Sequence, residues 1–500
     1  MNVKKFYIYP FHIFLIPIFF VWHVVNQYFG LIPFRFSIRF LLLYLLIGLV
    51  LFLLGKLLFR NIAKAGCWAS VFLLIFFFWG AFHDLLRRLY LPPFMVSYSV
   101  LLPFIGVVLL SISIWLKKKK NPPSQFNAFL NIVFFIFLAV EAFQSVYKAA
   151  SHQSQKNNLT YSKQEEVSVS TIGLQPKPDI FLFVFDEYAS TASLRQYLHY
   201  DNSQLDSLLT RNGFFVATHS KSNYNSTPLS LASFLNGQYL DGSLEGKTAG
   251  SSLVLQGQLT IKESKIIQFL ISRGYQVVNL GLCDLPTAPA AHESFFNSNA
   301  IEVLYLETLW GRVEKEIWWH VRKKTSINWT FMQSSRQVDI LNTNIQNYHR
   351  ALQELDTQSS QPRFVLVHLM LPHQPFFFNK TGDLRSTPYT DNPASYDSLY
   401  TDQVAYANTW IDSIAKLTNK PFDRARAVII AGDHGWRDKN NDPATRDKQF
   451  MNLHAVYFSD RDQSLLYDSI SPVNSFRVIL NKYFSAKLPL LKDSTIRVIE

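Results

Sequence analysis

Hydrophobic positions are spread very unevenly along the chain. Residues 1–150 carry long runs of Phe, Leu, Ile and Val, whereas residues 170–500 mix apolar and polar positions as a soluble α/β domain does. A helix needs about 20 apolar residues to cross the hydrocarbon core of a bilayer. Runs of that length predict a transmembrane domain over residues 1–150, a bundle of about five helices at approximately 7–25, 38–59, 67–86, 98–116 and 126–147.

Basic residues in the short loops between these runs predict the orientation of the bundle. Lys4 and Lys5 precede the first run, and further basic groups follow the second and the fourth, the last of them being the lysines at 117–120. Lys and Arg accumulate on the cytoplasmic side of a membrane, so an odd number of spans places everything after residue 150 outside. We therefore expect a multi-pass protein of the bacterial cytoplasmic membrane. The first span is expected to be retained, because no small-residue cleavage site follows it.

Charge and cysteine content add little to this picture. Much of the net charge of +12 comes from these loops, so we do not interpret it as a sign of nucleic-acid binding. Cys67 and Cys283 are not expected to form a disulfide, because Cys67 lies in a hydrophobic run. Glu141 lies inside the fifth run, and we expect it to pack against neighbouring helices or to lie near the outer interface.

The rest of the chain predicts a linker followed by one large α/β domain. Residues 151–177 are polar and lack helical periodicity, so we expect a linker there and an outer domain at 178–500. Continuous apolar strands that alternate with helices predict a mainly parallel central sheet covered on both faces. The strands are expected at 180–185, 214–217, 276–280, 364–370 and 427–431, and the helices at 203–211, 263–273, 335–356 and 398–418.

Acidic residues and a histidine directly follow two of the predicted strands. Asp186 and Glu187 come after IFLFVF, and Asp433 and His434 come after AVIIA and one glycine. An Asp at a strand end is more often a helix cap or turn former. Together, however, these residues would meet at one edge of a parallel sheet, where such folds bind ligands. Carboxylates beside an imidazole suit a divalent metal, zinc or manganese, with calcium or magnesium as alternatives.

A candidate nucleophile lies at the start of a predicted helix. Pro228 suits the first helical turn, which would place Thr227 at the N-cap. The simpler interpretation is that Thr227 is only that cap. The functional interpretation is that its hydroxyl attacks an ester whose charge is stabilised by the free N–H groups of the helix. A neighbouring metal ion would lower the pKa of that hydroxyl.

Three histidines in the outer domain are candidate site residues. His373 lies between two prolines in a loop after a strand, where it could bind an anionic group or protonate a leaving oxygen. His368 lies inside an apolar run, where a histidine is more often a hydrogen-bonded part of the core. His454 precedes a further short strand and is a weaker candidate for substrate binding.

Four segments together resemble a known family. FVFDEY, STPLSLASFLNG, LPHQPF and AGDHGW are similar to motifs of the sulfatase-like branch of the alkaline phosphatase superfamily. With a five-span anchor, the arrangement resembles lipoteichoic acid synthases and lipid A phosphoethanolamine transferases. The resemblance covers roughly residues 178–460 and the architecture of residues 1–150, and it implies an alkaline phosphatase/sulfatase-like fold for the outer domain.

The resemblance also implies roles for individual residues. Asp186, Asp433 and His434 would bind a divalent metal, with Glu187 beside them. Thr227 would be both a metal ligand and the nucleophile that forms a covalent phosphothreonine. His373 would contact the phosphoryl group of the substrate.

The chain also departs from its relatives. Arylsulfatases oxidise a Cys or Ser in a Cys/Ser-x-Pro-x-Arg motif to formylglycine, but Ser226-Thr227-Pro228 is not followed by the required Arg. Aligned backwards from the Asn-Gly at 236–237, Thr227 occupies the nucleophile position, and threonine cannot form that aldehyde. Asp-Glu at 186–187 stands where sulfatases show Asp-Asp, which leaves open whether one or two metal ions bind.

A segment rich in Trp and basic residues, YLETLWGRVEKEIWWHVRKK at 305–324, permits two interpretations. Trp beside Lys and Arg is typical of a helix at a membrane interface, which would suit a lipid substrate. Alternatively, an exposed helix packs its Trp face on the outer domain.

The sequence therefore predicts a metal-dependent, membrane-anchored phosphotransferase. Its expected reaction moves a phosphorylated head group, such as phosphoethanolamine or phosphoglycerol, through a threonine intermediate to a cell-envelope acceptor. The expected partners are the membrane and a lipid or cell-envelope glycan substrate, with no nucleic acid. The alternative is an extracytoplasmic sulfatase or phosphodiesterase that hydrolyses sulfate or phosphate esters.

Overall fold

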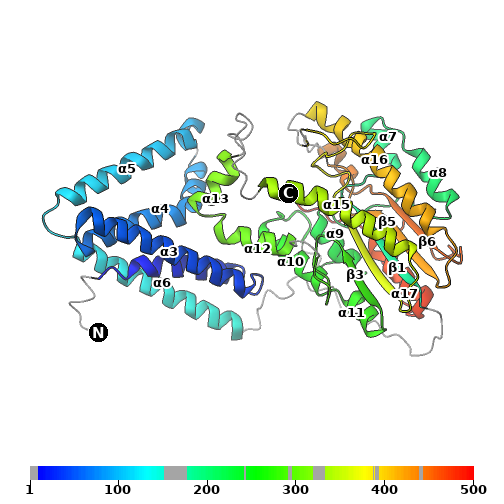
Figure 1. The fold of residues 1–500 in the computed structure, drawn as a ribbon, viewed down its shortest axis with the longest axis horizontal. Helices are drawn as coiled ribbons and strands as arrows, with labels where there is room; N and C mark the ends of the chain where they lie inside the picture. Colours follow the sequence, from blue (N-terminus) through cyan, green and yellow to red (C-terminus); the bar gives the residue numbers. More distant parts are fainter. Residues whose placement is uncertain are drawn as a thin grey trace. The chain divides into compact units, whose positions relative to one another are not determined.

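The chain forms two compact units. The computed structural model describes residues 9–89, 91–150, 177–240, 244–290, 295–318, 333–386, 388, 393–437 and 443–499 (Figure 1). The first unit, which we call the helical unit, comprises Met1–Lys156 and Ser298–Trp329. The second, the sheet unit, comprises Asn157–Asn297 and Thr330–Glu500. Ser298–Trp329 thus groups with the helical unit, although its sequence position had suggested the outer domain.

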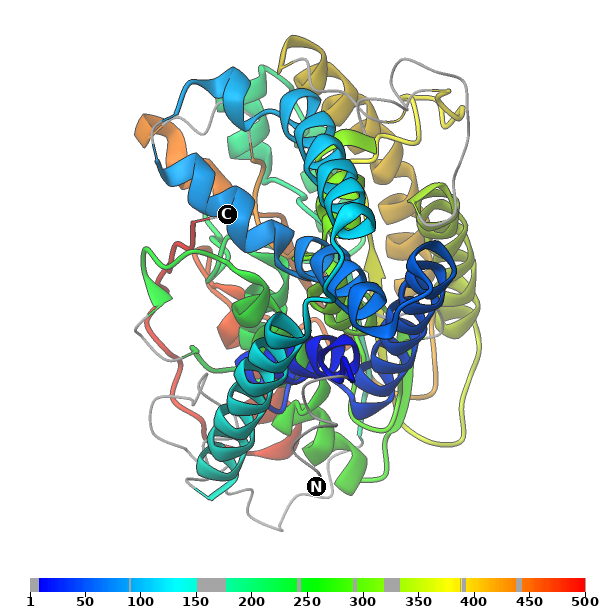
Figure 2. The same cartoon turned by 90° about the vertical axis from the view of Figure 1, so that its left-hand side faces the viewer.

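The helical unit consists of long apolar helices that follow the predicted runs closely. Figure 2 shows these helices in blue to cyan. Four of them are long and apolar enough to cross a membrane: α3 (Phe34–Phe59), α4 (Ile62–Arg88), α5 (Tyr98–Lys118) and α6 (Ser124–Ala150). A short 3₁₀ turn, η1 (Pro93–Val96), precedes α5. Helix α3 ends at Phe59, directly before Arg60, and α5 ends at Lys118, so both end at the basic groups from which the orientation was predicted.

The first predicted span is shorter than expected. Helix α2 (His12–Gln27) has 16 residues, about 24 Å at 1.5 Å per residue, against a hydrocarbon core of about 30 Å. The described residues therefore contain four helices of spanning length plus one shorter apolar helix, so the prediction of five is not confirmed as made. Helix α2 nevertheless packs against α3, α4 and α6.

Glu141 packs against a neighbouring helix, as one of the two predicted placements required. Its side chain is buried, and its carboxylate receives hydrogen bonds from the amide of Asn26 at 2.6 Å and from Nδ1 of His23 at 2.7 Å. Both partners belong to α2, so this polar cluster joins α2 to α6. A buried carboxylate would be costly without such partners.

The core of the sheet unit is a six-stranded sheet with the strand order β2-β6-β5-β1-β4-β3. Strands β3, β4, β1 and β5 are parallel neighbours, whereas β6 pairs antiparallel with both β5 and β2. The sheet is therefore mixed, and the mainly parallel prediction holds only for those four strands. The strands are β1 (Asp179–Phe185), β2 (Phe215–Val216), β3 (Gln276–Leu280), β4 (Arg363–Leu369), β5 (Arg426–Gly432) and β6 (His454–Phe458).

Helices cover both faces of this sheet (Figure 1). One layer packs α9, α11 and α17 against the sheet, and the other packs α7, α8, α15 and α16. The four helices predicted from sequence correspond to α8, α11, α15 and α16. The bounds are α7 (Thr191–Leu198), α8 (Ser203–Arg211), α9 (Thr227–Phe234), α10 (Ser251–Lys262), α11 (Lys265–Ser272), α12 (Phe295–Tyr305), α13 (Leu309–Val313), η3 (Glu314–Trp318), α15 (Gln333–Asp356), α16 (Pro393–Thr418), η4 (Pro443–Gln449) and α17 (Pro472–Phe484).

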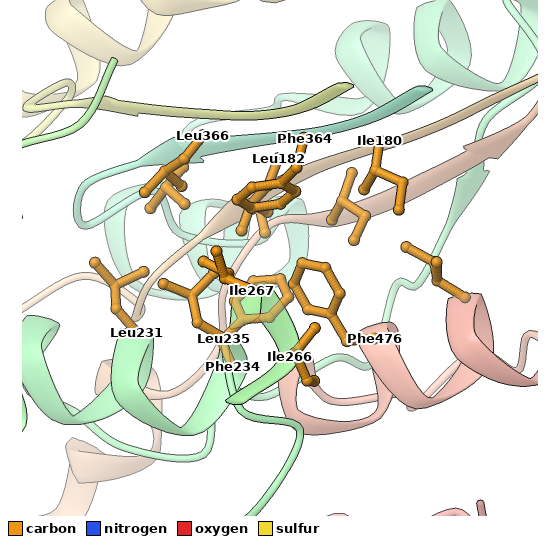
Figure 3. Packing of buried hydrophobic residues seen from close by; sticks show 14 of the residues in the cluster. Ile180, Leu182, Leu231, Phe234, Leu235, Ile266, Ile267, Phe364, Leu366 and Phe476 are labelled. Atoms are coloured by element: carbon orange, nitrogen blue, oxygen red, sulfur yellow. The ribbon is translucent and has the colours of Figure 1, made fainter. Parts of the chain in front are cut away.

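Side-chain alternation along β1 divides the core into two layers. Ile180, Leu182 and Val184 face α9, α11 and α17, whereas Phe181 and Phe183 face α15 and α16. Figure 3 shows Ile180 and Leu182 opposite side chains of α9 and α11. Each of these five side chains is fully buried, which contributes about 1.5–3 kcal/mol apiece to the driving force for folding. Strands that are apolar on both faces explain the continuous hydrophobic runs in the sequence.

Candidate metal centre and active site

The register of three neighbouring strands brings chemistry-bearing side chains to one edge of the sheet. Val184 of β1 lies opposite His368 of β4 and opposite Ala431 of β5. Asp186 and Asp433 each follow two residues beyond that level. Because side chains alternate with a period of two, all three polar residues continue the face that packs under α9. The apolar layer therefore ends in a polar cluster at the carboxyl ends of the strands.

The side chains of this cluster lie close enough to share one ion. Asp186, His368 and Asp433 each offer one ligand atom, and these atoms all lie within 4.8 Å of one another. Nε2 of His434 lies 3.6 Å from Oδ2 of Asp433 and 3.9 Å from Oδ1 of Asp186. All four side chains are buried. We call Asp186, His368, Asp433 and His434 the metal cluster.

The metal cluster contains polar atoms that have no partner in the described part of the chain. They are Oδ1 of Asp186, Oδ2 of Asp433, Nε2 of His434 and both ring nitrogens of His368. An unpartnered buried polar atom costs about 1–3 kcal/mol, and more when it is charged. Two carboxylates and two imidazoles with free ligand atoms turned toward one another match the donor set of a divalent cation. The residues present therefore fit a bound metal ion.

Backbone contacts fix the orientation of these ligand atoms. Oδ1 of Asp433 accepts hydrogen bonds from the N–H groups of Glu187 and His434, both at 2.9 Å, which leaves Oδ2 for the cluster. Nδ1 of His434 lies 2.8 Å from the carbonyl of Gly435. A carbonyl can only accept, so Nδ1 carries the proton and Nε2 keeps its lone pair. Such second contacts are typical of metal-ligating histidines.

The charge state of Asp186 follows from its neighbours. Burial acts to raise the pKa of its carboxyl group, but His373, His368 and His434 outweigh burial and hold the pKa below its usual range. Asp186 is therefore ionised at neutral pH, as a metal-ligating carboxylate has to be.

The structure does not bring Glu187 into the metal cluster, although the sequence suggested it as a ligand. Its carboxylate accepts a hydrogen bond from the N–H of Arg437 at 2.8 Å and lies 3.9 Å from Nε2 of His373. Strand β1 ends at Phe185, and Asp186 and Glu187 form the turn that follows it, so their side chains do not share one face. Glu187 also has a positive φ of 61°, which marks the sharp turn after β1.

The amino end of α9 lies beside the metal cluster. The hydroxyl of Ser230, in the first turn, donates to the carbonyl of Asp433. The helix begins at Thr227, and Ser226 is its N-cap with no side-chain capping bond, so the cap lies one residue earlier than predicted. Thr227 is partly exposed, and its hydroxyl makes no hydrogen bond to the described residues. It is therefore available to a ligand at the helix terminus.

His373 lies at the edge of the cluster and is only partly buried. The backbone N–H of His373 donates to the backbone carbonyl of Asp186 at 3.1 Å. Its side chain is 28% exposed, which distinguishes it from the four closed-in side chains of the metal cluster. Nδ1 contacts the carbonyl of Gln374, so Nε2 is the ring nitrogen that a substrate could meet.

His454 occupies a different environment from the other histidines. Its ring is fully buried, Nε2 contacts the hydroxyl of Ser475 at 2.9 Å, and Nδ1 contacts the carbonyl of Ile470 at 3.0 Å and the hydroxyl of Ser220 at 3.1 Å. Burial lowers its pKa to about 4. Both ring nitrogens are occupied, so the structure gives His454 no free atom for the substrate contact that the sequence suggested.

We expect His454 to make the sheet unit acid-sensitive. The pKa of about 4 lies below the ordinary 6.5, so stability from the neutral ring is present above pH 6.5 and is lost as the pH falls toward 4. The loss of unfolding free energy over this window should reach about 3 kcal/mol, from 1.36 kcal/mol per pKa unit. Denaturant titrations at several pH values should show that the unfolding free energy of His454→Gln falls less steeply with decreasing pH than that of the native chain. His349→Gln, at an exposed histidine, is the control. If the unfolding free energy depended on pH equally in all three proteins, His454 would not be the source of the acid sensitivity.

One cluster residue was missed by sequence reasoning. His368 was interpreted as a hydrogen-bonded core histidine, whereas its ring nitrogens have no hydrogen-bond partner in the described chain and Nε2 lies 3.3 Å from Oδ2 of Asp186. Its place one residue before the end of β4 was the available signal. A polar residue that near the carboxyl end of a parallel strand reaches the ligand-binding edge.

A buried cluster of two carboxylates and two imidazoles at the carboxyl ends of a doubly covered α/β sheet, beside a helix terminus, fits a divalent-metal site. The sequence model of the sulfatase family matches residues 178–457, more than half of the chain. The chain therefore belongs to the sulfatase family, and the predicted membership of the sulfatase-like branch of the alkaline phosphatase superfamily is confirmed.

The solved structures to which the chain is similar include phosphoethanolamine transferases. The periplasmic domain of EptC from Escherichia coli, in complex with Zn, shares 14% identity over 66% of this chain and 90% of its own, with a TM-score of 0.40. The integral membrane lipooligosaccharide phosphoethanolamine transferase A from Neisseria meningitidis shares 13% identity over 97% of this chain and 95% of its own, with a TM-score of 0.38. No curated protein matches the sequence.

Proposed function

We propose that this protein is a metal-dependent, membrane-anchored phosphotransferase. It moves a phosphorylated head group, such as phosphoethanolamine or phosphoglycerol, from a membrane lipid to a cell-envelope acceptor through a covalent intermediate on Thr227. The observation that carries the proposal is the buried metal cluster with unpartnered ligand atoms, set beside a helix that begins with a threonine. Four helices of spanning length in the same chain support a lipid substrate.

Each site residue takes a role that its position supports. Asp186, His368, Asp433 and His434 would hold the ion, with zinc or manganese favoured because two of the ligands are imidazoles. When bound, the ion would lower the pKa of the Thr227 hydroxyl and neutralise charge on the substrate. The backbone N–H of Thr227 would hydrogen-bond the transferred anion, because Pro228 has no N–H and the N–H groups of Leu229 and Ser230 already donate to the carbonyl of Ser226.

The transfer takes two displacements at phosphorus. The Thr227 oxygen bonds to the phosphorus of the donor diester, loses its proton, and the bond from phosphorus to the lipid oxygen breaks. That oxygen leaves as a hydroxyl after it takes up a proton, for which the partly exposed His373 is the candidate donor. An acceptor hydroxyl then attacks the same phosphorus, and Thr227 leaves with its proton restored.

Hydrolysis of sulfate esters is the alternative reaction, because the chain belongs to the sulfatase family. A formylglycine at Ser226 would be required, in the Ser-x-Pro arrangement formed with Pro228. Ser226, the N-cap of α9, is buried, whereas Thr227 is partly exposed. That difference favours Thr227 as the reacting residue and phosphoryl transfer as the reaction.

Mass spectrometry of the peptide around residue 227 tests the proposal. After incubation with membrane lipids and a divalent metal, Thr227 should gain the mass of a phosphorylated head group, because the intermediate is a covalent ester. The same peptide incubated with a chelator should remain unmodified. An aldehyde at residue 226, with no adduct at 227, would replace the phosphotransferase proposal by the sulfatase alternative.

Topology gives a second test of the proposal. We propose that α2 crosses the membrane with the four longer helices, which places the metal cluster outside the cytoplasm. A reporter that is active only outside the membrane should therefore be active when it is fused at residue 160. Activity of a cytoplasm-specific reporter at that position would mean an even number of spans and would exclude an extracytoplasmic active site.

A further inference from the structure

A segment between β3 and α15 leaves the sheet unit and packs on the apolar helices. Residues 298–318 fall between two parts of the sheet unit in sequence, yet they belong to the helical unit by their contacts. The boundary between the units lies within α12 (Phe295–Tyr305), so one helix carries the chain from one unit into the other. We call residues 298–318 the arm. In the predicted topology the arm meets the outward ends of α3 and α4.

The strongest contact of the arm is a desolvated arginine. The guanidinium of Arg312 forms a two-pronged pair with the carboxylate of Asp84 on α4, at 2.7 and 3.2 Å. It also binds Glu307 of the arm at 2.9 Å and lies 3.5 Å from Glu316. The Arg312 side chain is only 13% exposed. A bidentate pair between a planar guanidinium and a carboxylate stabilises the contact and also fixes the relative orientation of the two groups.

Backbone contacts place the arm directly against α4 and α3. The N–H of Gly80 donates to the carbonyl of Glu307 at 2.9 Å, and a Cβ on Gly80 would lie only 2.9 Å from that oxygen and 2.1 Å from the carboxylate. The buried hydroxyl of Tyr44 donates to the carbonyl of Leu304 at 3.0 Å. These contacts need the small residue at position 80, so the fit between arm and helix is specific.

We propose that the arm is a docking element that holds the connection between β3 and α15 on α3 and α4, and that this hold is required for transfer from a lipid donor in the bilayer. This inference rests on the proposed function. Among the described residues, no residue of the arm contacts the metal cluster, so the proposed role of the arm concerns the membrane-bound substrate and not the chemical step. The side chains of Lys315 and Trp318, and residues 319–324, lie outside the described part of the chain.

Two variants weaken docking by different physical means. Arg312→Ala removes the pair with Asp84, and Gly80→Ala pushes the arm away without a change of charge. The full-length protein in lipid nanodiscs is assayed with a fluorescent phosphoethanolamine lipid and, separately, with a soluble aryl phosphodiester. We expect the rate on the lipid donor to fall about tenfold or more, while the soluble diester rate stays within about twofold, because only positioning is lost.

Controls and hydrogen exchange separate docking from the chemistry. Arg350→Ala removes an exposed pair on α15, and Gly106→Ala adds a Cβ in α5 that meets nothing within 4 Å, so both should match the native rates. Amide exchange of residues 298–318 should accelerate in the two docking variants alone. Unchanged exchange, an unchanged lipid rate, or equal loss of both rates would overturn the inference. A native protein inactive on both substrates would instead refute the proposed function, and with it the role of the arm in donor access, while exchange would still decide docking.

Discussion

Replacement of Thr227 by alanine should reduce head-group transfer by about a thousandfold or more, because no covalent intermediate could form. The fold should remain intact. The Thr227 side chain caps no backbone group among the described residues, and it is partly exposed. Its loss should therefore change the unfolding free energy by no more than about 0.5 kcal/mol. Single-turnover kinetics with a lipid donor, together with metal analysis and a thermal melt, would measure all three quantities.

The neighbouring serine supplies the matched control for this variant. Ser226 is the N-cap of α9, yet its side chain makes no capping bond. Ser226→Ala should therefore retain most of the transfer rate as well as the fold. Near-normal turnover by Thr227→Ala, or a loss confined to Ser226→Ala, would show that Thr227 is not the nucleophile.

Asp433→Asn should abolish metal binding and transfer without loss of the fold. The substitution keeps the shape and still lets Oδ1 accept from the N–H groups of Glu187 and His434, but it removes the charge at the unpartnered oxygen. In a chelator the variant should melt at or above the native temperature, because a buried charge without a partner is destabilising. Added zinc should stabilise only the native protein, by about 2.7 kcal/mol at a hundred times the dissociation constant.

Metal content per chain and melting curves with and without zinc would check this expectation. Asp356→Asn, which alters an exposed pair with Lys420, should leave both metal content and rate unchanged. Stabilisation of Asp433→Asn by zinc to the native extent would show that the ion binds elsewhere.

The conformation of local segments followed from the sequence itself. The runs IFLFVF and AVIIA became β1 and β5 because strands buried on both faces need apolar side chains at every position. Four of the apolar stretches became helices long enough to span a bilayer, because such a span needs about 20 apolar residues in a row, whereas the first stretch formed a helix of only 16 residues. The sequence also predicted that Asp186 and Asp433 meet at one edge of the sheet, because the carboxyl ends of parallel strands lie at the same edge.

Tertiary structure decided which of these residues face one another. His368 joins the metal cluster only because β4 is placed beside β1 in a register that sets it opposite Val184, and no local pattern encodes strand order. The turn after β1, with its positive φ at Glu187, turned that side chain away from its neighbour Asp186. The direction of β6 likewise depends on the chain path between β5 and β6, which periodicity does not report.

The arm shows the same limit at the scale of whole units. Its Trp and basic residues suggested a membrane interface or a domain surface, but the partner of Arg312 could not be identified from sequence. Asp84 lies 228 residues away, and any of several acidic residues could have paired with that guanidinium. Sequence thus determined the kinds of segments and the chemistry available at their ends. Only packing, which selects one partner among many of equal chemistry, determined the metal cluster and the docked arm.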